Sequence, residues 1–529
     1  MENVLFDIDP NMINWARAQF ALTAIYHWLF VPLTLGLALI MGIMETCYYR
    51  TGKEFWKRTA QFWQRLFGVN FAMGVATGII LEFEFGTNWS NYSFIVGDIF
   101  GAPLAIEGIV AFFMESTFVA VMFFGWKKVS RGFHLTSTWL TGLGATISAW
   151  WILVANSWMQ HPVGQAFNPD TMRNEMVDFM AVALSPVAVD KFCHTVLSAW
   201  VLGAVFVTGV SAWYLLKRRH EEFAKASLRI GATVGLCASL LVAISGDHSA
   251  YLAGQTQPMK LAAMEALYNG GPDQSLTVIS AVNPFLQPDY ANEDEAPLRI
   301  AMPYALSFLA TRDIHGYVPG INDLIRGYTR PDGTQEPSLD EKIACGQKAI
   351  TALSQYRQAR KENDEALMQA SLEAFKANEA YFGYGYICTA DQIVPYIPVC
   401  FYAFRVMVGG GCLFILLFAL IVYYINREKL PKFLPALGSK PGIVPRWTLW
   451  TALWCIPVSY IVSESGWLVA EFGRQPWTIQ DMLPTWVSVS DLPSSSVAIT
   501  FFIFLILFST MLAVEINILC KQIKKGPEL

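Results

Sequence analysis

Nine long apolar stretches constrain the fold of this chain more than any other feature of its sequence. A helix needs about 20 apolar residues to cross the hydrocarbon core of a bilayer, where it satisfies its own backbone polar groups. Hydrophobic residues make up 54% of the 529 positions and charged residues only 15%. The sequence therefore predicts an all-α integral membrane protein with nine transmembrane helices. The stretches are 20–47, 66–86, 103–125, 135–157, 190–216, 227–247, 397–424, 447–470 and 495–519.

Basic residues mark alternate connections between these spans. Lysine and arginine gather after spans one, three, five and seven and in the C-terminal tail, whereas the opposite short connections hold few besides Arg173 and Arg474. By the positive-inside rule, the basic connections face the cytoplasm. We therefore expect the N-terminus outside and the C-terminus in the cytoplasm. The basic residues are Arg50, Lys53, Lys57, Arg58, Lys127, Lys128, Arg131, Lys217, Arg218, Arg219, Lys225, Arg427, Lys429, Lys432, Lys440, Lys521, Lys524 and Lys525.

One connection, residues 248–396, is far longer than the others and is predicted to lie outside. It is polar, and a loop of this length in a compact protein is usually functional or disordered. Apolar positions at helical spacing predict helix over 341–380. The chain thus divides into spans one to six (1–247), the outer loop (248–396) and spans seven to nine (397–529).

Charge and cysteine usage exclude several functional classes. The net charge of −5 leaves no extended basic surface, so nucleic acid is not expected as a partner. The nine cysteines include no CxxC pair, which gives no support to a zinc or iron–sulfur site. Cys345 and Cys388 lie in the outer loop, where an oxidising compartment would permit a disulfide between them.

Ionisable residues within the spans are the strongest pointers to function. Each costs about 2.5–3.5 kcal/mol to insert, so each has a functional role as its first hypothesis. His27 and His194 are the two histidines within spans, and either could be a hydrogen-bonding partner or a ligand. The other ionisable residues within the spans are Glu45, Glu82, Glu84, Glu107, Glu115, Glu464, Glu471, Glu515 and Arg405.

Two groupings among these residues suggest chemistry. His194 and Met407 both fall near the outer face, and His/Met ligation is a known haem pattern, although core packing also explains a methionine. Glu107 and Glu115 are separated by about 12 Å and about 80° on an ideal helix. They are candidate proton stations with Ser148 as a hydroxyl relay. The alternative is protonated acids bonded to neighbouring helices.

Six segments together resemble subunit I of cytochrome bd ubiquinol oxidases over nearly the whole chain. The outer loop resembles the long form of that family's quinol loop, although 363–386 matches poorly and no function is carried onto it. The segments are 21–27 (ALTAIYH), 97–107 (GDIFGAPLAIE), 191–195 (KFCHT), 260–265 (KLAAME), 404–407 (FRVM), and 466–467 (GW) with 471–477 (EFGRQPW).

The resemblance implies three haems and a set of ligands. His194 and Met407 correspond to the axial ligands of a low-spin haem b, with Arg405 near its propionates. His27 and Glu471 correspond to axial ligands of a high-spin haem b and a haem d, without assignment of which holds which. The resemblance further places Trp467 between haems, where the alternative is core filling, and it suggests Arg17 and Arg474 as propionate partners.

The resemblance also implies the substrates and the direction of proton flow. Lys260 and Glu265 correspond to the family's quinol-site pair, with Gln257 as a weaker neighbour. Quinol would be oxidised outside and dioxygen reduced to water with cytoplasmic protons, delivered through Glu115, Glu107 and Ser148. Proton motive force would then arise without a pump. A second membrane subunit, and a very small single-span one, are the expected partners in a bacterial inner membrane.

Three other interpretations stay open on the sequence. One is a haem-b-only relative that uses another quinone, because axial ligands do not encode haem type. A second is an ion-coupled transporter whose buried acids bind the coupling ion. The third is a non-catalytic assembly subunit, which the occupied ligand positions disfavour. The sequence does not specify the quinone, the oxygen affinity or the oligomeric state.

Overall fold

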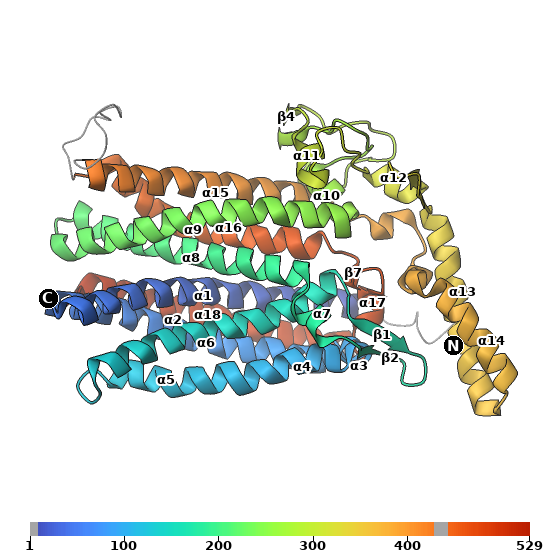
Figure 1. The fold of residues 1–529 in the computed structure, drawn as a ribbon, viewed down its shortest axis with the longest axis horizontal. Helices are drawn as coiled ribbons and strands as arrows, with labels where there is room; N and C mark the ends of the chain where they lie inside the picture. The colour runs from blue at the N-terminus through green and yellow to red at the C-terminus, as the bar shows by residue number, and fades with distance from the viewer. Residues whose placement is uncertain (1–8, 428–442, 529) are drawn as a thin grey trace.

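The computed structural model describes residues 9–427 and 443–528 as an elongated helical bundle with a loop region at one end (Figure 1). Within those residues, nine helical segments are long and apolar enough to cross a membrane, which confirms the predicted fold class. They extend past the predicted apolar stretches, because polar turns continue the helices beyond the hydrocarbon region. The segments are α1 (Pro10–Thr51), α2 (Glu54–Thr87), α4 (Asp98–Ile106) with η1 (Glu107–Phe112) and α5 (Phe113–Phe124), α6 (Arg131–Gln160), α7 (Phe179–Ala183) with α8 (Pro186–Leu216), α9 (Glu221–Thr256), η3 (Ala390–Ile393) with α15 (Ile397–Asn426), α16 (Arg446–Phe472) and α18 (Ser494–Lys525).

The third span is not a regular α-helix. The six residues of η1 are π-helical, and Pro103 lies within α4, four residues before Glu107. Proline removes a helical hydrogen bond, and π-helical turns occur mostly at functional sites. The expected separation of Glu107 and Glu115 by about 12 Å and 80° assumes ideal α-helical geometry, so it does not hold across this segment.

Helix α1 lies at the centre of the bundle and packs against α2, α6, α8 and α18. At its crossing with α8, Gly36 and Gly203 meet so closely that a Cβ on Gly36 would lie 2.6 Å from Gly203 Cα. Small residues of this kind let membrane helices approach each other. A second group consists of α8, α9, α15 and α16, which pack pairwise side by side.

The outer loop folds onto one end of the bundle (Figure 1). The predicted helix over 341–380 is confirmed in type but is two helices, because Asn363 between them adopts a left-handed conformation with φ 55°. The capping box of Ser338 and Glu341 starts the first of them. The elements are α10 (Pro258–Glu265), α11 (Ala305–Thr311), α12 (Ile321–Arg326), α13 (Leu339–Glu362), α14 (Glu365–Asn378) and η2 (Glu379–Tyr386).

In the part of the chain that the structure describes, four small antiparallel two-stranded sheets lie between the helices and leave the fold class unchanged. The elements are β1 (Gln165–Asn168) with β2 (Arg173–Met176), β3 (Leu276–Ile279) with β4 (Ile300–Met302), β5 (Tyr328–Thr329) with β6 (Gln335–Glu336), and β7 (Trp477–Ile479) with β8 (Leu483–Pro484), together with α3 (Ser90–Val96) and α17 (Thr485–Ser488). Cys345 and Cys388 carry free thiols.

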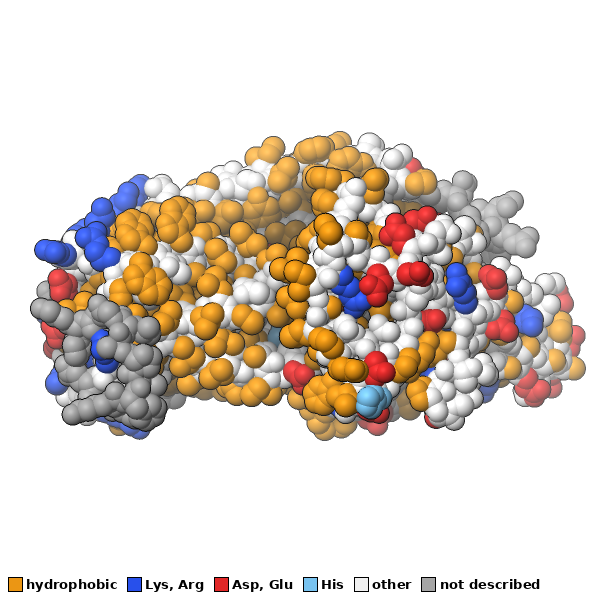
Figure 2. Space-filling view, turned by 90° about the horizontal axis from the view of Figure 1, so that it is seen from above, with side chains coloured by type: hydrophobic (Ala, Val, Ile, Leu, Met, Phe, Trp, Pro, Cys, Tyr) orange, Lys and Arg blue, Asp and Glu red, His pale blue; other side chains and the backbone are white. Residues whose placement is uncertain are grey.

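Surface chemistry follows the long axis of the molecule. Figure 2 shows an apolar surface over the bundle, acidic side chains over the loop region, and a group of basic side chains at the opposite end. Lys429, Lys432 and Lys440, which contribute to the predicted orientation, lie outside the described residues. The orientation itself stays a prediction.

Candidate functional site

One large cavity of about 840 Å³ runs inside the bundle between α1, α2, the third span, α6 and α16. Ten residues singled out from the sequence line it, although they come from five different spans and the segment after α16. The sequence-predicted residues that this cavity brings together are Arg17, His27, Glu82, Glu107, Glu115, Ser148, Glu464, Trp467, Glu471 and Arg474. Trp467 packs edge-to-face against Trp28 with 5.2 Å between ring centroids.

The hydrogen bond of His27 fixes which ring nitrogen can act as a ligand. Its Nδ1 lies 3.0 Å from the Thr77 hydroxyl, and that hydroxyl donates its own proton to the backbone carbonyl of Met73 or Gly74. The hydroxyl therefore accepts from His27 Nδ1–H, which leaves Nε2 with a free lone pair. A Cβ at position 78 would lie 3.0 Å from His27 Cε1, so Gly78 makes room for the ring.

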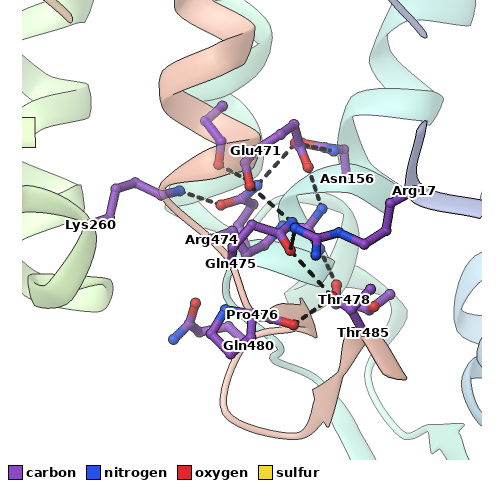
Figure 3. Close-up of polar contacts among 12 residues, drawn as sticks. Arg17, Asn156, Lys260, Glu471, Arg474, Gln475, Pro476, Thr478, Gln480 and Thr485 are labelled. Carbon is purple, nitrogen blue, oxygen red and sulfur yellow. Dashed lines mark hydrogen bonds and ion pairs between the residues drawn. The ribbon is translucent and has the colours of Figure 1, made fainter. Parts of the chain in front are cut away.

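Glu471 lines the cavity next to the C-terminal end of α16, within a dense polar network (Figure 3). Its carboxylate forms an ion pair with Arg474 and accepts from Asn156 Nδ2 at 3.1 Å and Gln160 Nε2 at 3.2 Å. Arg474 also donates to the carbonyl of Thr478. An anionic side chain at this depth is thus compensated by charge and by hydrogen bonds, as a buried charge must be.

Sequence reasoning missed the amide and lysine partners of Glu471. Lys191 donates to Asn156 Oδ1 at 2.7 Å, and Lys260 donates to Gln160 Oε1, so two cations approach Glu471 through one amide each. Lys191 belongs to the segment 191–195 that carries the family resemblance, and this was the only sequence feature that could have pointed to its role beside Glu471. Nothing in the sequence pattern links Asn156 or Gln160 to a glutamate more than 300 positions away.

The two candidate proton stations face α6 from the third span. Ser148 donates to Glu107 Oε1 at 2.6 Å, and Glu107 Oε2 is buried without a hydrogen-bond partner among the described residues. Glu115 packs against Gly144, where an added Cβ would lie 2.7 Å from its Cγ. Both carboxylates line the cavity that His27 and Glu471 line.

His194 and Met407 form a second candidate ligand set outside that cavity's lining, in the group α8, α9, α15 and α16. His194 Nδ1 lies 2.9 Å from the Ser245 hydroxyl, which donates to the Val242 carbonyl, so the ring is again oriented with Nε2 free. Cβ atoms at Gly246 and Gly466 would lie 3.2 Å from His194 Cε1 and 3.3 Å from Met407 Sδ. A glycine therefore leaves space beside each side chain.

The three predicted quinol residues lie at the two ends of α10 and take different partners. Lys260 donates to Gln257 and Gln160, whereas Glu265 pairs with Arg405, Nη2 to Oε2 at 3.0 Å. Burial, followed by the neighbouring Lys191, lowers the pKa of Lys260 well below its usual range. Burial raises the pKa of Glu265 to about 7 against the opposing effect of Arg405.

These residues fit a macrocyclic group that holds iron. Imidazole and thioether are donors that haem iron takes, and both imidazoles here are oriented by a hydrogen bond that leaves Nε2 free. The glycines beside His27, His194 and Met407 leave space that any larger residue would reduce. Arg17 lines the cavity and donates to Gln475 Oε1 at 3.0 Å, and its guanidinium is a group that can pair with a carboxylate.

The fold and the site together define a polytopic helical membrane protein with a large internal cavity lined by potential cofactor ligands. The family model for cytochrome bd terminal oxidase subunit I matches residues 15–527. The chain belongs to this family, as the sequence segments predicted, and is a multi-pass protein of the bacterial inner membrane.

Individual relatives agree with this assignment. The chain is 40% identical to cytochrome bd-II ubiquinol oxidase subunit 1 of Escherichia coli, over 98% of this chain and 97% of the relative. It is 36% identical to cytochrome bd ubiquinol oxidase subunit 1 of Bacillus subtilis, over 97% and 94%. The bd oxidase structure from Geobacillus thermodenitrificans matches with a TM-score of 0.76 at 20% identity, over 98% of this chain and 99% of that one, which shows a shared fold.

Proposed function

We propose that this chain is the haem-carrying subunit of a terminal oxidase that oxidises quinol at its outer face and reduces dioxygen to water with cytoplasmic protons. As a member of its family, it is a subunit of a quinol:oxygen oxidoreductase. The observation that carries the proposal is that His27, Glu471, Glu107 and Glu115 line one cavity. The side chains that we propose as cofactor ligands and as proton carriers therefore line the same cavity.

Haem is the cofactor implied by the family, and the finer assignment is our proposal. His194 and Met407 would hold a low-spin haem b, and His27 and Glu471 would hold a high-spin haem b and a haem d. When bound, these groups supply electron transfer and dioxygen binding. Arg17 and Arg474 are the propionate partners we propose, and Trp467, which lines the cavity, would lie between haems.

Quinol oxidation would take place in the outer loop. The Glu265 carboxylate accepts a proton from the quinol hydroxyl, while the Lys260 ammonium stabilises the developing anion and Gln257 orients that ammonium. Arg405 holds Glu265 in place through two guanidinium contacts, one to the carboxylate and one to the Thr277 carbonyl at 2.6 Å. The proton leaves to the outer side.

Proton uptake would run through the third span from the cytoplasmic side. Glu115 passes protons to Glu107, whose orientation the Ser148 hydroxyl fixes, and from there into the cavity. Because protons enter from one side and leave quinol on the other, charge is separated without a pump. Each unit charge moved across 100 mV is worth about 2.3 kcal/mol. The N-terminus lies outside and the C-terminus in the cytoplasm in this proposal.

The complex would contain a second membrane subunit of similar size and a very small single-span one. Oxygen consumption by the purified complex with a soluble ubiquinol tests the function. We expect quinol-dependent consumption that Lys260→Met and Glu265→Gln reduce while haem content is kept. Full quinol oxidation by both variants would refute the proposed quinol site, and the absence of quinol-dependent consumption would refute the function.

A further inference from the structure

The second half of the outer loop rests on the hairpin that follows α16. Tyr384 of η2 packs edge-to-face on Trp477 of β7, with ring centroids 5.1 Å apart. Next to it, Gly383 lies so close to the hairpin that a Cβ there would come within 2.4 Å of the Asp481 carbonyl oxygen. The loop segment therefore fits this hairpin closely, and residues on both sides of the contact have little freedom to move.

A continuous chain of hydrogen bonds leads from this contact to Lys260. The Tyr384 hydroxyl donates to Asp481 Oδ1 at 2.7 Å, and Gln480 Nε2 donates to the same oxygen at 2.9 Å. Gln257 Nε2 then donates to Gln480 Oε1 at 3.0 Å, and Lys260 Nζ donates to Gln257 Oε1 at 2.7 Å. Figure 3 shows Lys260 to the left of the Glu471 network and Gln480 below it.

The two ends of this chain determine the orientation of both amides between them. An ionised carboxylate only accepts hydrogen bonds and an ammonium only donates them, whereas an amide can turn either way. Asp481 makes Gln480 present its NH₂ group, which turns the Gln480 oxygen toward Gln257. Gln257 then presents its own oxygen to Lys260. A second chain, from Lys260 through Gln160 to Glu471, has the same polarity.

Lys260 is buried, and its side chain is restrained because its ammonium donates hydrogen bonds to the amide oxygens of Gln160 and Gln257. We propose that Asp481, fixed by Tyr384, is a positioning residue for Lys260 in quinol binding, and that the second half of the long loop serves to hold it there. This inference rests on the proposed quinol site and gives a role to the part of the loop that matched the family poorly.

The test measures steady-state oxidation of a soluble ubiquinol by the complete complex. Asp481→Asn can donate where Asp481 only accepts, so it permits the amide chain to reverse, and we expect the KM for quinol to rise about tenfold with kcat changed less than twofold. Tyr384→Phe removes one hydroxyl, keeps the stacking on Trp477, and should raise KM about threefold. Asp481→Glu retains a group that only accepts hydrogen bonds, so its KM for quinol should rise much less than that of Asp481→Asn.

Tyr381→Phe, on the same turn, is the matched control and should leave both constants unchanged. Reduced-minus-oxidised spectra report haem content for every variant, so a folding defect in Asp481→Asn is seen directly and the milder Tyr384→Phe then decides. An unchanged KM in Tyr384→Phe and Asp481→Asn, beside a raised KM in Lys260→Met, overturns the positioning role. An unchanged KM in Lys260→Met overturns the proposed quinol site instead.

Discussion

Arg405 and Glu265 form an ion pair, 3.0 Å from Nη2 to Oε2, that joins the start of the outer loop to α15 two residues before Met407. Arg405 also donates to the carbonyls of Met264 and Thr277, so the guanidinium holds both the residue before Glu265 and the strand facing it. The proposed quinol base and the proposed low-spin ligand helix are thus physically connected.

Quinol oxidation should depend on the protonation of Glu265. Burial raises the pKa of this carboxyl to about 7, and only the deprotonated form, present above that pH, can accept the quinol proton. We expect kcat/KM for a soluble ubiquinol to fall as the pH drops through about 7. Glu265→Gln should lower kcat/KM and abolish this titration, whereas Glu373→Gln on exposed α14 should keep it. A pH profile of Glu265→Gln identical to that of the parent would contradict the role of this carboxylate.

Each hydroxyl that orients a histidine should control one type of haem. Thr77→Val removes the acceptor for His27 Nδ1, and Ser245→Ala removes the acceptor for His194 Nδ1. Loss of such a partner typically weakens metal binding about 10–100-fold. Thr77→Val should therefore reduce the high-spin absorbance and Ser245→Ala the low-spin absorbance, measured as haem per protein. If both variants lost the same bands, the division into two ligand sets would be wrong.

The route through the third span should limit oxygen reduction. Glu107→Gln keeps the size of the side chain but cannot release a proton, and positioned acid–base groups contribute about 10²-fold or more. We expect oxygen consumption to fall about 100-fold with haem spectra intact, and Ser148→Ala to have a smaller effect because it only orients Glu107. The exposed Glu221→Gln serves as the control. Full activity of Glu107→Gln would exclude this route.

Two native cysteines offer a test of orientation. Cys388 is exposed in the outer loop, and Cys520 is exposed in the last turns of α18. A membrane-impermeant maleimide applied to intact spheroplasts should label Cys388 and should reach Cys520 only after permeabilisation. Cys388→Ser and Cys520→Ser identify the two signals. The reverse order of labelling would invert the proposed topology.

Much of the fold could be predicted from the sequence because a span in lipid must be mostly apolar and must satisfy its backbone polar groups by helical hydrogen bonds. The nine spans follow directly from hydropathy. The π-helical turn at Glu107 was not predicted, since a proline four residues earlier is compatible with a simple kink. The break at Asn363 was not predicted either, because asparagine within a helical pattern only weakly favours a left-handed residue.

The candidate site was predictable in its residues but not in its pairings. Histidine, methionine and glutamate within spans stand out because charge and polarity are costly there. The partners of these residues could not be predicted, because Asn156 and Glu471 are 315 positions apart and Arg405 and Glu265 are 140 positions apart. Sequence reasoning grouped Glu265 with Lys260 and Arg405 with a propionate, whereas the structure pairs Glu265 with Arg405.

The most direct test of the account is the reduced-minus-oxidised absorbance spectrum of the purified complex with substitutions at the four proposed ligands. We predict haem absorbance in the parent, selective loss of the low-spin b signal in His194→Ala and Met407→Leu, and selective loss of high-spin signals in His27→Ala and Glu471→Ala. A complex without tetrapyrrole absorbance, or four variants with the parent's spectrum, would contradict the claim that these side chains hold haem iron.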